Sequence, residues 1–93
     1  DDFQSSKLTD TFNRLIDQSQ VTAIILNLDE VSFVDSVGLG TIAIAGKKLL
    51  QKTGHLHIVC SQHKIAKMVT MSGIISATKD TIQIFDSFEA ALN

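Results

Sequence analysis

Two neighbouring stretches decide the fold: Val21–Leu28 (VTAIILNL) and Phe33–Gly40 (FVDSVGLG). The first is a nearly continuous apolar run with many branched side chains, which is typical of a strand buried on both faces of a parallel sheet. The second contains Asp35 and Ser36, and after them the apolar residues recur with a helical period. Together they predict a buried strand that leads through a short turn into a helix.

The rest of the chain alternates between helical and strand patterns around this unit. We expect helices over residues 4–18, 37–52 and 62–71, further strands over 55–60 and 81–85, and a short last helix that ends near 92. Strands joined by single-helix crossovers pair in parallel, with right-handed connections. The sequence therefore predicts one α/β domain over residues 1–93, with a single open, mostly parallel sheet and helices packed on at least one face.

Capping chemistry predicts where several of these helices begin and end. Gly54 is expected in a left-handed conformation after the 37–52 helix, whose last turn is rich in lysines that we expect to be solvated. Ser61 is expected to be the N-cap of the 62–71 helix, in which Met68 and Met71 are expected to pack. Asp86 is expected to open the last helix as a capping box with Glu89.

The composition excludes several functional classes. The 93 residues are 44% hydrophobic and 19% charged, which favours a folded domain over a disordered chain. The formal charge is −2 and no basic stripe is present, so we expect no direct nucleic acid partner. The apolar runs fall short of the roughly 20 residues of a membrane helix. A single cysteine, Cys60, suits a reducing compartment, and we expect a cytoplasmic protein without a membrane segment.

The turn at Asp35 and Ser36 is the most informative site candidate. Either residue is a good N-cap for the following helix, so a purely structural role is as well supported by the local chemistry as a functional one. Gly38 and Gly40 each cost about 1 kcal/mol relative to Ala within a helix, and a close approach of another backbone or of a ligand is the usual reason for such glycines. A phosphate on Ser36 would add about −1.5 to −2 charges at this turn, which is a suitable basis for a binding switch.

The segment Leu26–Gly40 (LNLDEVSFVDSVGLG) resembles the signature of the STAS family, the bacterial anti-sigma factor antagonists. Residues 68–74 (MVTMSGI) resemble a second segment of that family, in which a helix is followed by Ser-Gly-Leu, with Ile74 in place of the leucine. The resemblance covers essentially the whole chain. It implies a phosphorylation-switched protein-binding module rather than an enzyme, with no cofactor and no metal.

The same resemblance implies the partners and the residues that serve them. An anti-sigma factor with serine-kinase activity would phosphorylate Ser36, a PP2C-type phosphatase would remove the phosphate, and the unphosphorylated form would bind the anti-sigma factor and release a sigma factor. Asp35 would orient the turn, and the glycines would give the partner close access to the backbone. The partner-binding residues implied in this way are Asp1, Asp35, Val37, Gly38, Leu39 and Gly40.

The sequence departs from the family pattern at two places. The family begins with a β-hairpin, whereas this chain starts at or just after that point, so an N-terminal strand or hairpin is expected to be missing. By spacing, Asp1 or Asp2 matches the acidic residue that the family has near the phosphorylated serine, and Asp1 is the better match. An uncovered sheet edge could then be filled by a second chain, as in a homodimer. Val37 stands where many relatives have a second Ser or Thr, which leaves Ser36 as the one hydroxyl in the turn.

Other residue types suggest weaker alternatives. His55, His57 and His63 lack a Cys or carboxylate at convincing ligand spacing, so we expect no metal site. Cys60 has no evident activating group and is expected to be a small buried hydrophobe. A STAS-like domain that binds a nucleotide, or that is a structural subunit of a larger signalling or transporter complex, remains the alternative function. No acid–base arrangement supports a hydrolase.

Overall fold

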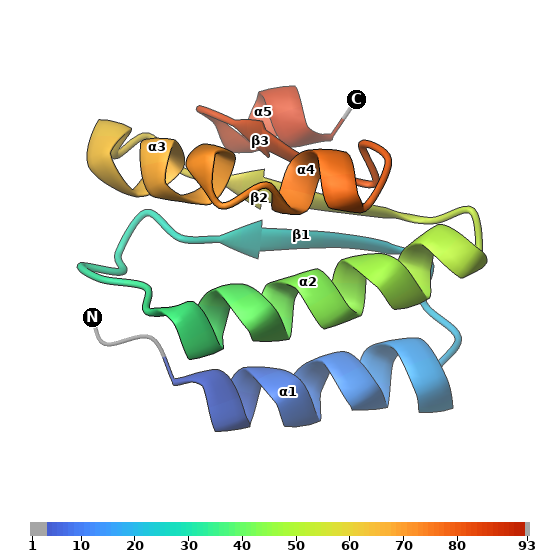
Figure 1. Ribbon diagram of the computed structural model, residues 1–93. Coiled ribbons are helices and arrows are strands. Elements are labelled where there is room, and N and C mark those ends of the chain that lie inside the picture. The colour runs from blue at the N-terminus through green and yellow to red at the C-terminus, as the bar shows by residue number, and fades with distance from the viewer. Residues whose placement is uncertain (1–3, 93) are drawn as a thin grey trace.

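The computed structural model describes residues 4–92, which form a three-stranded sheet with helices on both of its faces (Figure 1). The elements in chain order are α1 (Ser5–Asn13), the π-helical turn η1 (Arg14–Gln18), β1 (Ala23–Asn27), α2 (Ser36–Gln51), β2 (His55–Val59), α3 (His63–Met71), α4 (Ile74–Ala77), β3 (Ile82–Phe85) and α5 (Phe88–Ala91). No helix among these residues is both long and apolar enough to cross a bilayer.

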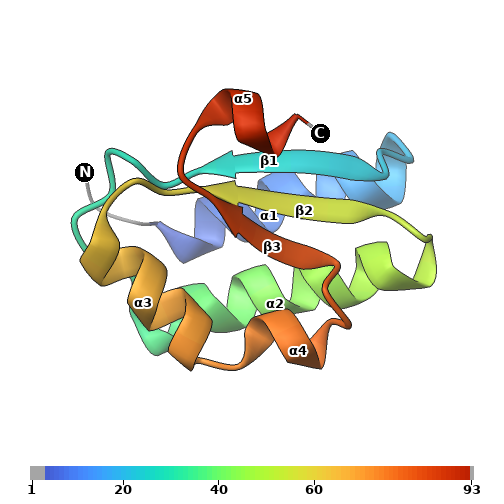
Figure 2. The same cartoon turned by 90° about the horizontal axis from the view of Figure 1, so that it is seen from above.

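The sheet is parallel throughout and has the order β1-β2-β3. In register, Ile24 pairs with Leu56, which in turn pairs with Ile82. Seen from above, α5 lies over one face of the strands, whereas α1 and α2 lie beneath the other (Figure 2). The prediction of an open parallel α/β sheet with packed helices is therefore confirmed.

The core is a layer in which side chains of the strands meet those of α1, α2 and α3. Leu56, Ile58 and Ile82 point from the strands into this layer, and Ile42 and Leu49 meet them from α2, all with 0% of their surface exposed. Burying one such side chain contributes about 1.5–3 kcal/mol relative to leaving it in water. The apolar period predicted for residues 37–52 is thus the stripe that holds α2 against the sheet.

The first strand is less buried than its sequence predicts. Ala23 and Asn27 are exposed, and the three residues between them are only partly buried. Within the part of the chain that the structure describes, β1 has β2 as its one strand neighbour. The prediction of burial on both faces is therefore wrong, because little covers the face of β1 that is turned away from α2.

The link between α2 and β2 needs glycine for space rather than for its backbone angles. The left-handed residue there is Thr53, with φ of 51°, so the prediction of a left-handed Gly54 is wrong. A Cβ on Gly54 would lie 2.2 Å from the carbonyl oxygen of Thr22 and 3.2 Å from a methyl group of Leu49. The helix end therefore packs directly on the start of β1, and this close approach is possible only without a side chain.

Two predicted helix caps are displaced by one residue. Gln62, not Ser61, is the N-cap of α3, and it makes no side-chain capping bond. Ser87, not Asp86, is the N-cap of α5, and its Oγ accepts a hydrogen bond from Ala90 N at 3.1 Å. In both cases a neighbouring polar residue takes the boundary position.

Further differences concern the ends of helices. The expected helix over residues 4–18 becomes α1 followed by η1, and the lysine-rich end of α2 holds this turn: Lys52 Nζ donates to Ile16 O at 2.7 Å. Lys52, and Lys48, which forms an ion pair with Asp17 at 2.9 Å, are therefore not simply solvated as predicted. Gly73, with φ of +86°, ends α3 as predicted but then starts α4, which the sequence analysis did not anticipate. Met71 is 75% exposed, so its predicted packing role is wrong.

Candidate functional site

Ser36 lies at the edge of the sheet where the strands end and α2 and α3 begin (Figure 1). It is the first residue of α2 and is exposed. Asp35 is the N-cap: its backbone is extended, and its Oδ1 accepts a hydrogen bond from Gly38 N at 2.8 Å. The hydroxyl of Ser36 has no hydrogen-bond partner among residues 4–92. The capping role that either residue could fill therefore belongs to Asp35.

The local field at Ser36 has two opposing contributions. The N-terminus of the 16-residue helix α2 carries partial positive charge, which favours a phosphate group at this position. The carboxylate of Asp35 is adjacent and repels it. A phosphoserine here would be compatible with the helix while making the surface strongly anionic.

Two large apolar side chains close to Ser36 in the sequence are exposed. Phe33 is 60% exposed and Val37 is 63% exposed, although large apolar side chains are usually covered. Val34, between them in sequence, is 1% exposed and anchors the turn in the core. The turn therefore presents two exposed apolar side chains and one exposed hydroxyl, and the buried side chain of Val34 anchors its backbone.

The structure separates the other predicted partner-binding residues into two groups. Gly40 is exposed, and a Cβ added to it would meet no heavy atom within 4 Å. Gly38 is buried, and Leu39 packs partly against the core. Gly40 is thus open to a partner, whereas the other two face inward. Asp1 lies outside the residues that the structure describes.

A clamp of hydrogen bonds holds the loop that leads from β1 to Ser36, and the sequence analysis missed it. Gln62 Nε2 lies 3.2, 2.9 and 2.7 Å from the carbonyl oxygens of Leu28, Asp29 and Val31. In return, Asp29 Oδ1 accepts hydrogen bonds from Ser61 N and Ser61 Oγ, at 2.6 and 3.0 Å. The bonded residues are more than 30 positions apart in the sequence, so no local sequence pattern predicts these hydrogen bonds.

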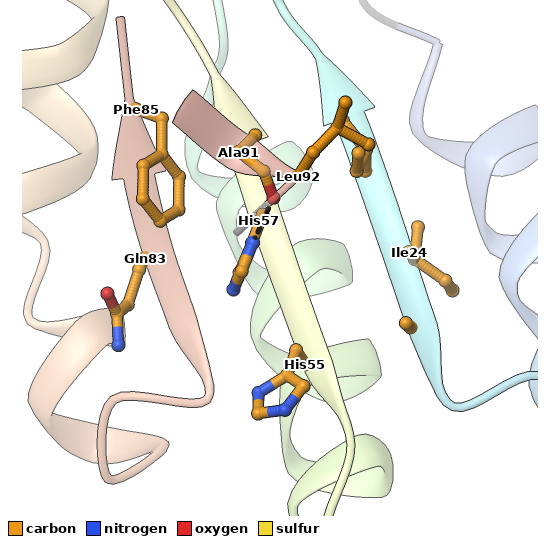
Figure 3. A pocket seen from close by; sticks show the side chains of 9 residues that line it. Ile24, His55, His57, Gln83, Phe85, Ala91 and Leu92 are labelled. Carbon is orange, nitrogen blue, oxygen red and sulfur yellow. Dashed lines mark hydrogen bonds between the residues drawn. The ribbon is translucent and has the colours of Figure 1, made fainter. Parts of the chain in front are cut away.

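A groove of about 510 Å³ lies on the face of the sheet that α5 partly covers (Figure 3). His55, His57, Gln83 and Phe85 point into it from β2 and β3 (Figure 3). His57 Nδ1 lies 2.6 Å from Ala91 O and ties α5 to the sheet. None of the residues that line the groove is Lys or Arg, so it does not favour the phosphates of a nucleotide.

The histidines and the cysteine lie where a structural role is expected. The rings of His55 and His57 are 5.6 Å apart, whereas His63 begins α3 beyond the other end of β2. Within residues 4–92, no three His, Cys, Asp or Glu side chains gather around a possible metal position. Cys60 is buried, and its Sγ lies 3.5 Å from Gln62 O, in keeping with a small buried hydrophobe.

Comparisons with known proteins support the family that the Ser36 segment suggests. No solved structure matches the chain. The family model described as STAS domain matches residues 1–91, which include every element of the sheet and the turn at Ser36. The chain therefore belongs to the STAS domain family.

Proposed function

We propose that this STAS domain is an anti-sigma factor antagonist whose binding to its partner is switched by phosphorylation of Ser36. In this proposal the unphosphorylated chain binds an anti-sigma factor that is also a serine kinase, and a sigma factor is thereby released. The observation that carries the proposal is the exposed hydroxyl of Ser36, which bonds to none of residues 4–92 and lies beside a cap made by Asp35. Modification of Ser36 leaves the capping bond of α2 in place.

The modification requires no catalytic group from this chain. Ser36 Oγ attacks the γ-phosphorus of ATP, an Oγ–P bond forms, the bond between the γ-phosphorus and the bridging oxygen breaks, and ADP leaves. The kinase accepts the serine proton. A PP2C-type phosphatase reverses the step with water and releases inorganic phosphate. The domain is then a cytoplasmic substrate and binding module with no cofactor of its own.

The surface around Ser36 explains how one phosphate would abolish binding. Phe33 and Val37 are exposed apolar side chains of the kind that anchor protein interfaces. A phosphate on Ser36, which lies between them in the sequence, adds about −1.5 to −2 charges that must be desolvated if a partner covers this turn. The expected effect is therefore a loss of affinity without a loss of the fold.

Phosphorylation of the purified chain tests the proposal. The chain is incubated with the serine kinase that it captures from its source cell and with Mg-ATP, and the product is mapped by mass spectrometry. We expect one phosphate on Ser36, none in Ser36→Ala, and normal phosphorylation in Ser32→Ala, a matched change at another exposed serine of the same loop. We also expect Ser36→Asp to bind the kinase at least about tenfold more weakly, a loss of about 1.4 kcal/mol.

Two results would contradict the proposal. One is a phosphate on another residue, or none at all, when the captured kinase is active on a control substrate. The other is unchanged affinity of Ser36→Asp in a binding titration. Ser36→Ala is expected to unfold at the same urea concentration as the wild type, because its hydroxyl bonds to no described residue; this separates signalling from stability.

A further inference from the structure

We propose that Gln62 is a positioning residue for the loop that presents Ser36. It lies at the N-cap position of α3, where a short polar side chain commonly caps the helix. Its side chain makes no such bond and instead reaches across to residues 28–31. Its polar end therefore serves another loop, the one between β1 and α2.

The chemistry of the three contacts identifies the amide NH₂ as the group that matters. Leu28, Asp29 and Val31 all present carbonyl oxygens, which are acceptors, to one nitrogen at 2.7–3.2 Å. An amide NH₂ has two hydrogens, so the three oxygens share two donors. Without these donors, part-buried carbonyl oxygens would be left without a hydrogen-bond partner. Leaving a buried acceptor unsatisfied costs more free energy than a typical hydrogen bond contributes.

Other contacts also hold this loop: Asp29 Oδ1 accepts from Ser61 N and Ser61 Oγ, and Leu28 N donates to Val59 O at 2.8 Å. Asp29 N donates to the side chain of Asn27 at 2.8 Å, and Val31 N donates to Leu28 O at 3.1 Å. The next fixed points toward Ser36 are the β-bridge at Phe33, the buried side chain of Val34 and the cap at Asp35. Gln62 adds to these contacts the only side-chain donor among residues 4–92 that bonds three carbonyl oxygens of this loop, and we infer that it helps to set the path of the backbone toward the turn.

The conformation of this loop affects how strongly a partner binds, because a partner binds only the molecules in the correct conformation. If the loop samples other conformations, only a fraction of the molecules presents Ser36 and its apolar neighbours in the binding geometry. The apparent dissociation constant then rises in inverse proportion to that fraction. Loss of the Gln62 donors should therefore raise KM for the kinase and leave the maximal rate nearly unchanged. This step rests on the proposed function, whereas the effect on the loop does not.

Hydrogen exchange of the full chain tests the effect on the loop without any kinase. We expect Gln62→Met, which has similar size and no donor, to speed the exchange of the Asp29 and Val31 amides by about tenfold, as the loss of one to two neutral hydrogen bonds predicts. Gln83→Met is the matched control, because Gln83 Nε2 donates to a single carbonyl, that of Asp80, on another edge. We expect it to leave loop exchange unchanged.

Gln62→Glu tests whether the NH₂ donors of Gln62 matter, or only the space that its side chain fills. Glu has the shape of Gln, but its carboxylate would face three carbonyl oxygens and lie near the carboxylate of Asp29. We expect faster loop exchange and a higher KM than in Gln62→Met at pH 7, with partial recovery as the pH falls and the introduced carboxylate gains a proton. Exchange in the β2 core is monitored to separate loop opening from global unfolding.

Each outcome decides a different step. Loop exchange at the wild-type rate in both Gln62→Met and Gln62→Glu would overturn the positioning role. Faster loop exchange with unchanged KM for the captured kinase would overturn its link to recognition. Absence of Ser36 phosphorylation in the wild-type chain would refute the proposed function alone, since the exchange measurement still decides whether Gln62 holds the loop.

Discussion

Replacement of Gly40 by Ala should stabilise the domain and weaken its proposed partner interaction. Gly40 is the fifth residue of α2, and a Cβ there would meet no heavy atom within 4 Å. The substitution therefore carries no steric cost in the free chain. Ala is more favourable than Gly in a helix interior by about 0.8–1.0 kcal/mol, so we expect a gain of that size in the free energy of unfolding.

Thermal and urea denaturation measure this gain. For a domain of 60–100 residues, 1 kcal/mol corresponds to a rise in Tm of about 4–8 °C. Gly46→Ala in the same helix is the matched control with the opposite sign, because its Cβ would lie 2.5 Å from Ile82 Cδ1 and 3.1 Å from Thr78 Cγ2. Overpacking of a filled core costs about 1–3 kcal/mol, so this variant should melt below the wild type.

The two readouts test separate parts of the reasoning. A Gly40→Ala variant that melts at or below the wild-type temperature would refute the claim that the space over Gly40 is open. A stabilised variant that binds the captured kinase with unchanged affinity would refute close partner access at this residue. A stabilised variant with weakened binding is the expected outcome, and it would explain why a costly glycine stands in the second turn of α2.

Two further substitutions test the local geometry. Asp35→Ala should lower the free energy of unfolding by about 1 kcal/mol, because Gly38 N loses its capping acceptor. Asp35→Asn keeps an acceptor and should keep most of the stability. Equal losses of stability in the two variants, measured by urea denaturation, would contradict the capping role. Gly73→Ala should cost about 1–2 kcal/mol, because φ is +86° there and L residues avoid that region; an unchanged Tm would contradict it, and Gly73→Asn should lose less.

The sequence predicts the sheet well because its signals are local. The apolar period of residues 37–52 became the buried stripe of α2, and the branched run before Asp29 became β1 in a parallel sheet. Burial of β1 was overestimated. A run of apolar residues is compatible with burial on both faces, but it does not show how many layers cover the strand. The caps at Ser61 and Asp86 failed by one residue because two adjacent polar side chains satisfy the same rule.

At the candidate site, the sequence predicts which residues matter, and the structure shows which role each of them has. The motif identified Asp35 and Ser36 but left open which of them caps α2, and the bond to Gly38 N assigns this role to Asp35. The part played by Gln62 could not be predicted, because it depends on carbonyl oxygens that lie 31–34 residues away in sequence. Contacts of this kind have no periodicity, so only the folded chain reveals them.

The contact between Gln62 and residues 28–31 bears on whether an incompletely folded chain can present Ser36 in the same way. In the folded chain, donors for the loop before Ser36 come from residues 61 and 62, which follow β2 in the sequence. A nascent chain that ends before residue 62, or a short peptide around Ser36, lacks this support. If the proposed function holds, we therefore expect the kinase to phosphorylate the folded domain in preference to an incomplete chain or a short peptide around Ser36.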